Sequence, residues 1–288
     1  MHCKYYGLIA AALALSPLTQ AKDITIFDEV TQGKKNNKGW WGGSALQNDV
    51  NVDTRGIKED NETEPGTAIG QEWDLEAFHL NGTTLSMIGG FNFLTGEGTY
   101  ASGDIFIDVD GDAVFGPSTP GGTGTTLKSN SLFGYDYVIS LQGRGLNGSY
   151  DSVDQTIDGT YKVYKISNSS VDVTVAAIGS ANPWTYHSGG ELIRNPATPG
   201  SDIYGTATQT AYTGGEYQGF NGNNNHYELG GFDLSFLGSQ LGPGTLFKFT
   251  MECGNDNLIG RVPDGGTTML MLGMSLGGLA FVSRRFRA

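Results

Sequence analysis

Three carboxylates are spaced two residues apart in one short segment, where Trp73 and Leu75 separate Glu72, Asp74 and Glu76. Alternate residues of a β-strand lie on one face of the sheet, so this spacing would place the three acids side by side. Two carboxyl groups about 5 Å apart can serve as nucleophile and acid/base in the hydrolysis of a glycosidic bond. The segment is therefore a candidate catalytic site, with a solvated or cation-binding face as the alternative.

The order Glu-x-Asp-x-Glu resembles the catalytic strand of laminarinase-like and lichenase-like β-glucan hydrolases. The resemblance implies that Glu72 is the nucleophile, Asp74 its modulator and Glu76 the acid/base. Three acids in five residues also arise easily in a chain that has 30 of them. We therefore keep β-glucan hydrolysis as an alternative and expect a protein that is not an enzyme.

A second acidic segment, residues 108–112 (DVDGD), spaces three carboxylates two residues apart around a glycine that lets the chain turn. Carboxylate oxygens at close range are ligands that Ca²⁺ prefers. The segment is not an EF-hand loop, because glycine follows the second aspartate and Thr119 stands where that loop has glutamate. Asp108, Asp110 and Asp112 are therefore candidate calcium ligands, and an exposed turn is the alternative.

Other reactive residue types show no arrangement that indicates catalysis. The sequence has no nucleophile elbow, no phosphate-binding loop and no Rossmann fingerprint. Cys3 precedes the first apolar run and would leave with it, so Cys253 has no disulfide partner in its own chain. We expect Cys253 to be buried and inert or to pair with another chain. The four histidines lack zinc-site spacing and are expected in the core or at the surface: His2, His79, His187 and His226.

The elements that would position these residues are strands. Apolar and polar residues alternate in short runs separated by clusters of Gly, Asn and Ser, at 103–109, 135–141, 171–175 and 247–252. Period two predicts strands that each have one buried and one solvent-facing side. No long helical period lies between them, and a parallel sheet would need such helices. We therefore predict an all-β fold, an antiparallel β-sandwich or jelly roll, with loops at 32–66 and 116–124.

The acidic charge of the chain excludes one class of partner. The protein has 30 acidic and 17 basic residues and a net charge of −13. Four bases (Lys4, Arg284, Arg285 and Arg287) but only one acid, Asp264, lie in residues 1–21 and 262–288, so residues 22–261 carry 13 bases against 29 acids. A surface of this charge repels phosphate backbones, which excludes nucleic-acid binding. Cations, sugars or simple solubility fit it better.

The N-terminus has the features of a secretory signal peptide. Lys4 supplies a positive flank, residues 7–15 (GLIAAALAL) form a short apolar run, and small residues, Thr19 and Ala21, stand at −3 and −1 of a cleavage point. Nine apolar residues are too few to span a bilayer. We predict cleavage of a signal peptide at 1–21, which leaves residues 22–260 as a single Gly-rich β domain.

The C-terminal segment, 261–288, combines a short motif, an uncharged apolar run and a basic stop. The run covers 267–283, which is near the lower limit for a membrane-spanning helix, and the arginines at 284–287 should stay on the cytoplasmic side. These features predict a transient membrane anchor. The motif before the run consists of Val262, Pro263, Asp264 and Gly265.

This tail resembles the VPDSG-type variant of the PEP-CTERM sorting signal, and the motif here reads VPDGG. The resemblance implies that an exosortase recognises Val262 to Gly265, and that the helix and the basic stop (Arg284, Arg285, Arg287) are removed on release or transfer to the surface. Parts of the middle resemble recurring segments of PEP-CTERM surface proteins: 72–93, 103–112, 182–190, 226–238 and 250–260.

The favoured function is a non-enzymatic protein of the cell surface or extracellular matrix, exported through transient anchoring in the inner membrane. Its expected partners are an exosortase, that membrane and an exopolysaccharide. A carbohydrate-binding surface module is the first alternative, because Trp40, Trp41 and Trp184 near Gly and Asn could stack on sugar rings, although tryptophan more often belongs to the core.

Overall fold

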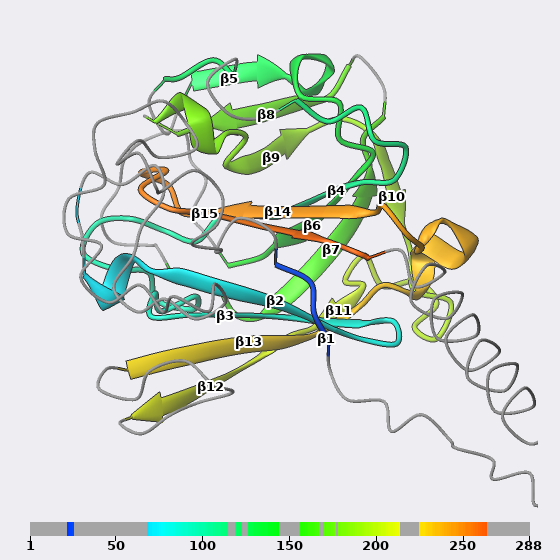
Figure 1. The fold of residues 1–288 in the computed structure, drawn as a ribbon. Coiled ribbons are helices and arrows are strands. Elements are labelled where there is room, and N and C mark those ends of the chain that lie inside the picture. Colours follow the sequence, from blue (N-terminus) through cyan, green and yellow to red (C-terminus); the bar gives the residue numbers. More distant parts are fainter. Residues whose placement is uncertain are drawn as a thin grey trace, which may run out of the picture.

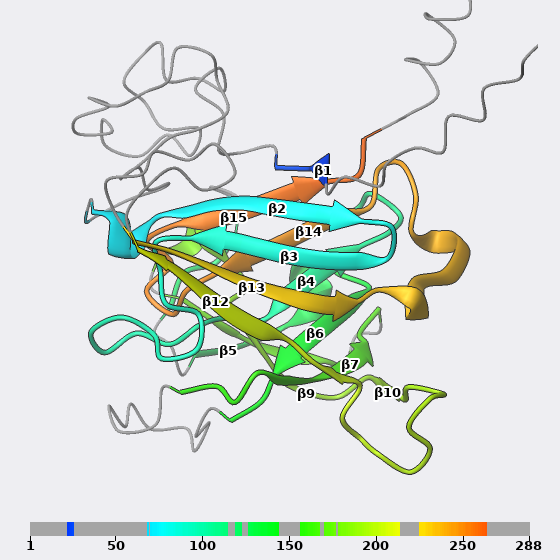
Figure 2. The ribbon, with the colours of Figure 1, turned by 90° about the horizontal axis from the view of Figure 1, so that it is seen from below.

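The structure is a computed structural model that describes residues 22–25, 68, 70–114, 119–122, 126–143, 156–167, 170–176, 178–213 and 225–263. The described strands pair in antiparallel fashion and form three sheets stacked in layers (Figures 1 and 2). The predicted antiparallel β-sandwich is confirmed. The predicted signal peptide at 1–21 and the apolar run at 267–283 lie outside the described residues.

The first layer is a five-stranded sheet with the order β1-β2-β3-β13-β12. Its strands are β1 (Lys22–Asp23), β2 (Leu75–Asn81), β3 (Thr84–Gly89), β13 (Asn225–Asp233) and β12 (Thr208–Thr213). A short 3₁₀ helix, η2 (Gln71–Trp73), leads into β2. Gly90, just after β3, must be glycine because a Cβ there would lie 1.7 Å from the carbonyl oxygen of Gln71. The sheet is thereby drawn tightly against η2.

The central layer is a seven-stranded sheet with the order β10-β7-β6-β4-β14-β15, and β11 also pairs with β7. Its strands are β4 (Ile105–Asp108), β6 (Tyr137–Leu141), β7 (Thr160–Lys165), β10 (Glu191–Ile193), β11 (Gly205–Thr206), β14 (Leu246–Thr250) and β15 (Asn257–Arg261). The 3₁₀ helix η6 (Ser235–Gln240) connects β13 to β14, and so joins the first layer to the central one.

The third layer is a three-stranded sheet with the order β5-β8-β9. Its strands are β5 (Thr126–Ser129), β8 (Asp172–Val175) and β9 (Thr185–Ser188), with the 3₁₀ helices η4 (Asn130–Leu132) after β5 and η5 (Gly179–Ala181) before β9. This small sheet covers the face of the central sheet that the five-stranded sheet leaves open (Figure 1).

Two apolar clusters fill the two spaces between the layers. Ile105 and Ile107 of β4 pack with Phe78 of β2 in the larger cluster, whereas Phe106 packs with Val173 of β8 in the smaller one. All residues of β4, β6 and β14 are consequently buried. The expectation of one solvent-facing side is therefore wrong for these strands, because a third layer covers the side that was predicted to be wet.

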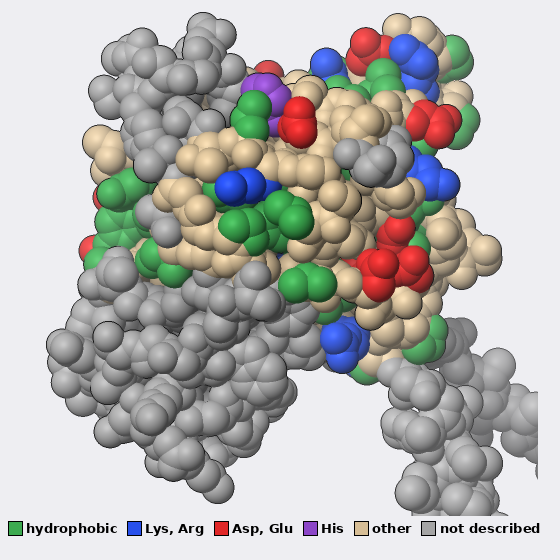
Figure 3. Space-filling view, turned by 90° about the horizontal axis from the view of Figure 1, so that it is seen from above, with side chains coloured by type: hydrophobic (Ala, Val, Ile, Leu, Met, Phe, Trp, Pro, Cys, Tyr) green, Lys and Arg blue, Asp and Glu red, His purple; other side chains and the backbone are tan. Residues whose placement is uncertain are grey.

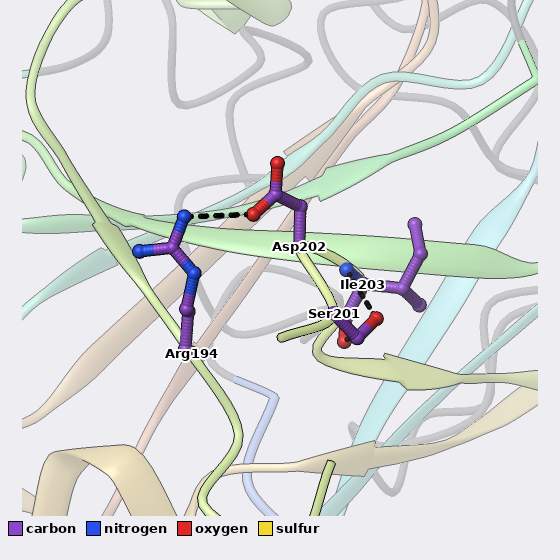
Figure 4. Close-up of polar contacts among 4 residues, drawn as sticks. All are labelled: Arg194, Ser201, Asp202 and Ile203. Atoms are coloured by element: carbon purple, nitrogen blue, oxygen red, sulfur yellow. Dashed lines mark hydrogen bonds and ion pairs between the residues drawn. The ribbon is translucent and has the colours of Figure 1, made fainter. Parts of the chain in front are cut away.

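The loop between β10 and β11 is exposed and closed by short-range polar contacts (Figure 4). Arg194 Nη2 lies 2.8 Å from Asp202 Oδ1, with both side chains more than half exposed. The Ile203 N–H donates to Ser201 Oγ at 3.0 Å. An exposed ion pair of this kind contributes little stability, so the loop can tolerate change. Among the described residues, no helix has the length and apolar character needed to cross a membrane.

Candidate functional site

The acidic loop at 108–112 starts from a buried end of the central sheet. β4 ends at Asp108, whose side chain is only 2% exposed. Asp108 Oδ1 accepts hydrogen bonds from the N–H groups of Asp110 (3.0 Å) and Gly111 (2.7 Å), and its Oδ2 accepts from Ala113 N (3.2 Å). The loop backbone thus wraps around the Asp108 carboxylate, which fixes the part of the chain that carries Asp110 and Asp112.

The structure brings the three sequence-predicted aspartates together. One carboxylate oxygen from each of Asp108, Asp110 and Asp112 lies within 4.8 Å of the other two, and the last two residues are exposed. Oxygen ligands sit about 2.3–2.6 Å from Ca²⁺, so oxygens on opposite sides of one ion are about 5 Å apart. The three carboxylates therefore fit the ligand shell of a single calcium ion. Figure 3 shows one face of the molecule, on which some acidic side chains gather in compact groups.

A fourth carboxylate, Asp136, lies beside this loop and was not predicted. Its Oδ2 accepts a hydrogen bond from Val109 N at 2.9 Å. Burial raises the pKa of Asp136, and the charges of Asp110, Asp108 and Asp112 add to that rise. Loss of hydration and the charges of Asp110 and Asp108 likewise raise the pKa of Asp112. Mutual repulsion of this kind favours a cation among the four groups.

The backbone around Asp136 is shaped to receive the acidic loop. Gly134 has φ +78°, and a Cβ there would lie 2.7 Å from Asp112 Oδ1. Only glycine adopts this backbone conformation without strain and leaves room for the carboxylate. The segment before β6 and the loop after β4 therefore form one compact acidic unit.

The other acidic segment does not form the arrangement expected of a glycosidase. β2 begins at Leu75, so Glu72 belongs to η2 and is exposed, whereas Asp74 and Glu76 are 0% and 1% exposed. The expectation that Glu72, Asp74 and Glu76 share one strand face is therefore wrong. The local reason is that the chain makes a 3₁₀ turn at Gln71–Trp73 before it enters the sheet.

Glu76 has a buried partner that the sequence did not reveal. Its Oε1 lies 2.9 Å from His226 Nε2, with both side chains fully buried, and it accepts a hydrogen bond from Gln71 Nε2 at 2.7 Å. His226 belongs to β13, which is separated from β2 by β3. The two residues stand 150 positions apart, so no local pattern could have paired them. A polymeric substrate could not reach side chains buried in this way.

The remaining predicted residues are distributed between core and surface. His79 is buried on β2 and His187 is exposed on β9. Trp184 is 3% exposed and packs with Ala101 and Ala176, so it offers no face to a sugar. Every described tryptophan and tyrosine is buried or half-buried. His2, Trp40 and Trp41 lie outside the described residues.

Cys253 is half-buried, and no partner cysteine lies among the described residues. Burial raises the pKa of its thiol to about 11. The thiol is therefore protonated at neutral pH and is a weak nucleophile.

The predicted sorting motif starts where the last strand ends. β15 ends at Arg261, and Val262 and Pro263 are the last residues that the structure describes. Asp264, Gly265, Arg284, Arg285 and Arg287 lie outside the described residues.

In a comparison with known protein families, residues 261–286 match the family described as VPDSG-CTERM motif. No curated protein and no solved structure matches the chain.

Proposed function

The chain carries a PEP-CTERM-like C-terminal sorting signal of the VPDSG type, and on this premise we propose that it is a non-enzymatic component of the cell surface or extracellular matrix. The signal marks an exported protein that transits a membrane and is processed by an exosortase. In our proposal, a signal peptide is removed after Ala21, and the exosortase cuts within or near Val262–Gly265.

One observation carries the proposal: the matched signal begins at the last residue of a layered β domain. The burial of two of the three candidate catalytic carboxylates supports the proposal further. Asp74 and Glu76 are buried, and Glu76 is engaged by His226 and Gln71. A role in structure or adhesion requires a stable, exposed scaffold rather than an open catalytic cleft.

Intact-mass measurement of the protein from a host with its exosortase tests the sorting step. The mature protein should lack residues after about Asp264, and deletion of the exosortase should leave the full tail in place. Replacing Arg284, Arg285 and Arg287 by alanine provides a second arm, because it removes the basic stop and leaves the motif unchanged. Recovery of mature protein that retains Arg287 in the presence of the exosortase would reduce the tail to a simple anchor.

The non-enzymatic role is tested on the same mature protein. It should release no reducing sugar from β-glucans, and Glu72→Gln should change nothing in that assay. A glycan array provides the test for the carbohydrate-binding alternative. Hydrolysis that depends on Glu72 and Glu76, or saturable binding to one class of glycan, would replace the proposed role with one of the two alternatives.

We further propose that the loop of Asp108, Asp110 and Asp112 binds Ca²⁺ and that Asp136 assists. Its support is the close approach of the carboxylate oxygens and the raised pKa values of Asp112 and Asp136. An ion that binds only the folded state stabilises it by about 2.7 kcal/mol at a hundredfold excess over Kd. Since each kcal/mol shifts the melting temperature of a domain of this size by about 2 to 4 °C, calcium should raise it by several degrees over chelator.

The matched variant for the calcium test is Asp108→Asn combined with Asp110→Asn. Asparagine keeps the shape of the side chain and, at position 108, one oxygen that can accept the N–H groups of Asp110 and Gly111; the two substitutions remove two charges and the acceptor for Ala113 N. The variant should lose most of the difference between calcium and chelator. If wild-type protein melts at the same temperature in both buffers, the loop is a solvated turn and the metal proposal is wrong.

A further inference from the structure

The sorting signal begins inside the folded domain rather than after a linker. Arg261 is the last residue of β15 and the first residue matched by the signal. Val262 is half-buried and packs against the larger apolar cluster, whereas Arg261 and Pro263 on either side are exposed. The first residue of the motif is thus packed against the core.

Three backbone hydrogen bonds hold this point of the chain. Arg261 N donates to Ile24 O at 2.7 Å. Val262 N donates to Thr245 O at 2.9 Å, and Val262 O accepts from Gly244 N at 2.9 Å. We call Ile24, Gly244 and Thr245 the exit clamp. Figures 1 and 2 both show β1, which leads into Ile24, lying beside the end of β15.

Both sides of the exit clamp are anchored in the fold. Ile24 is 3% exposed, and its N–H donates to Phe78 O of β2 at 2.9 Å. Thr245 is 2% exposed, and its Oγ1 donates to Gln240 O at 3.0 Å and accepts from Gly242 N at 3.2 Å. The clamp therefore does not yield through a single side-chain rotation, and opening it requires local unfolding of the chain end.

The clamp uses the backbone groups that a peptidase would need. Enzymes and domains that bind an extended peptide commonly do so through its backbone N–H and C=O groups, and both of these groups of Val262 are occupied. Only four residues separate Val262 from the apolar run at 267, so the five steps between them span about 17 Å when fully extended. A peptidase at the membrane surface must therefore engage the motif directly against the folded domain.

We propose that the folded domain masks Val262, the first residue of its own sorting motif, so that the population of molecules with an open exit clamp limits the rate of exosortase processing. The inference rests on the proposed function, because it assumes that an exosortase cuts this tail. The fraction of molecules with an open clamp sets the rate when opening and closing are fast relative to cleavage.

A four-residue insertion, Gly-Ser-Gly-Ser, between Arg261 and Val262 tests this directly. The inserted backbone can occupy the clamp, while the complete motif moves away from the domain. In a pulse-chase experiment with the exosortase-bearing host, the cut form should appear about tenfold faster than from wild type, which corresponds to about 1.4 kcal/mol of clamp opening. The same insertion after Gly200, in the exposed loop between β10 and β11, is the matched control and should leave the rate unchanged.

A second variant, Thr245→Val, loosens the clamp without changing the motif. It removes the two hydrogen bonds of Oγ1 and should also accelerate processing, by a smaller factor than the insertion. An unchanged or slower rate in the insertion variant would overturn the inference, since the exosortase would then read Val262 in its clamped position. If no cut form appears from any chain, including wild type and the Gly200 control, the proposed function fails rather than the clamp.

Discussion

Replacing Lys248 by methionine should remove part of the pH dependence of the protein's stability. Lys248 lies in the middle of β14, opposite Phe106 of β4 and Ile259 of β15, and its side chain is 0% exposed. Its Nζ donates a hydrogen bond to Pro183 O and lies 6.0 Å from the centroid of the Phe106 ring. Burial lowers the pKa of this amine well below its ordinary value of 10.5.

The sign and size of the effect follow from proton linkage. Between the lowered pKa of the folded state and about 10.4, the unfolded chain binds one proton that the folded protein does not. The free energy of unfolding of wild type should therefore rise with pH across this window by up to about 1.4 kcal/mol per pH unit. Below the folded-state pKa both states bind the proton, so the contribution of Lys248 no longer changes with pH. Lys248→Met lacks this slope, so the difference in the free energy of unfolding, variant minus wild type, should be greatest at neutral pH and fall towards pH 10.

Urea unfolding of wild type and Lys248→Met at pH 7, 8, 9 and 10 measures the difference. Cys253, whose thiol pKa is raised to about 11, and Tyr161 and Tyr186, whose pKa values are raised to about 12, should lower stability at high pH. These groups are common to both proteins and cancel in the comparison. Lys165→Met, at an exposed position of β7, controls for the loss of a lysine. Parallel pH profiles for wild type and Lys248→Met would refute the assignment of a neutral buried amine.

Three further changes test the packing and the acidic unit. In a denaturant titration, Gly90→Ala should destabilise the protein by about 3 kcal/mol or more, because the new Cβ would meet the Gln71 carbonyl. Gly242→Ala is the control: its Cβ enters open space, so the free energy of unfolding should change by no more than about 0.5 kcal/mol. Asn130→Ala should cost about 2–4 kcal/mol in that titration, because the buried carbonyls of Tyr135 and Ile166 lose their donor at 2.7 and 2.8 Å. Asp136 has a raised pKa in the folded state and so lowers stability above that pKa. Asp136→Asn should consequently raise the melting temperature in chelator at pH 7, with a gain that disappears towards pH 4; a lower melting temperature at pH 7 would mean that its charge is stabilising.

The sequence predicted the strands better than their environment. Alternation located β4, β6, β8 and β14, because period two is a local property of the chain. It could not show which sides are buried, since that depends on how a third sheet, in which β5 pairs with the distant β8, packs on the central one. Asp104 and Lys248 occupy the side that was predicted to be wet, yet both are 0% exposed. Polar residues in an alternating strand mark one face, and only the tertiary structure decides whether water reaches it.

The candidate site divides in the same way between local and distant contributions. Asp108, Asp110 and Asp112 could be predicted as a group because a single loop carries them. Asp136 and the pair of Glu76 with His226 could not, since other strands supply the second partner. The sorting signal at 261–286 was predicted because its motif, apolar run and basic stop follow one another directly in the sequence. The contacts of Val262 with Gly244 and Thr245 required the structure.

Buried polar side chains provide a physical reason for the small third sheet to stay on the central one. A sheet of three strands leaves backbone N–H groups without partners in its own ladder, and each would cost free energy if buried unpaired. Asp104 supplies an acceptor to one such N–H group in each of two layers. Its Oδ1 accepts from Leu141 N of β6 and its Oδ2 from Tyr186 N of β9, both at 2.8 Å.

Two further side chains connect the layers in the same way. Lys248 Nζ donates to Pro183 O, just before β9, and Asn130 Nδ2 donates to Ile166 O, just after β7. The polar residues that broke the apolar pattern of the strands therefore bind one layer to the next. This explains how the chain can cover both sides of its central sheet without an uninterrupted apolar sequence in those strands.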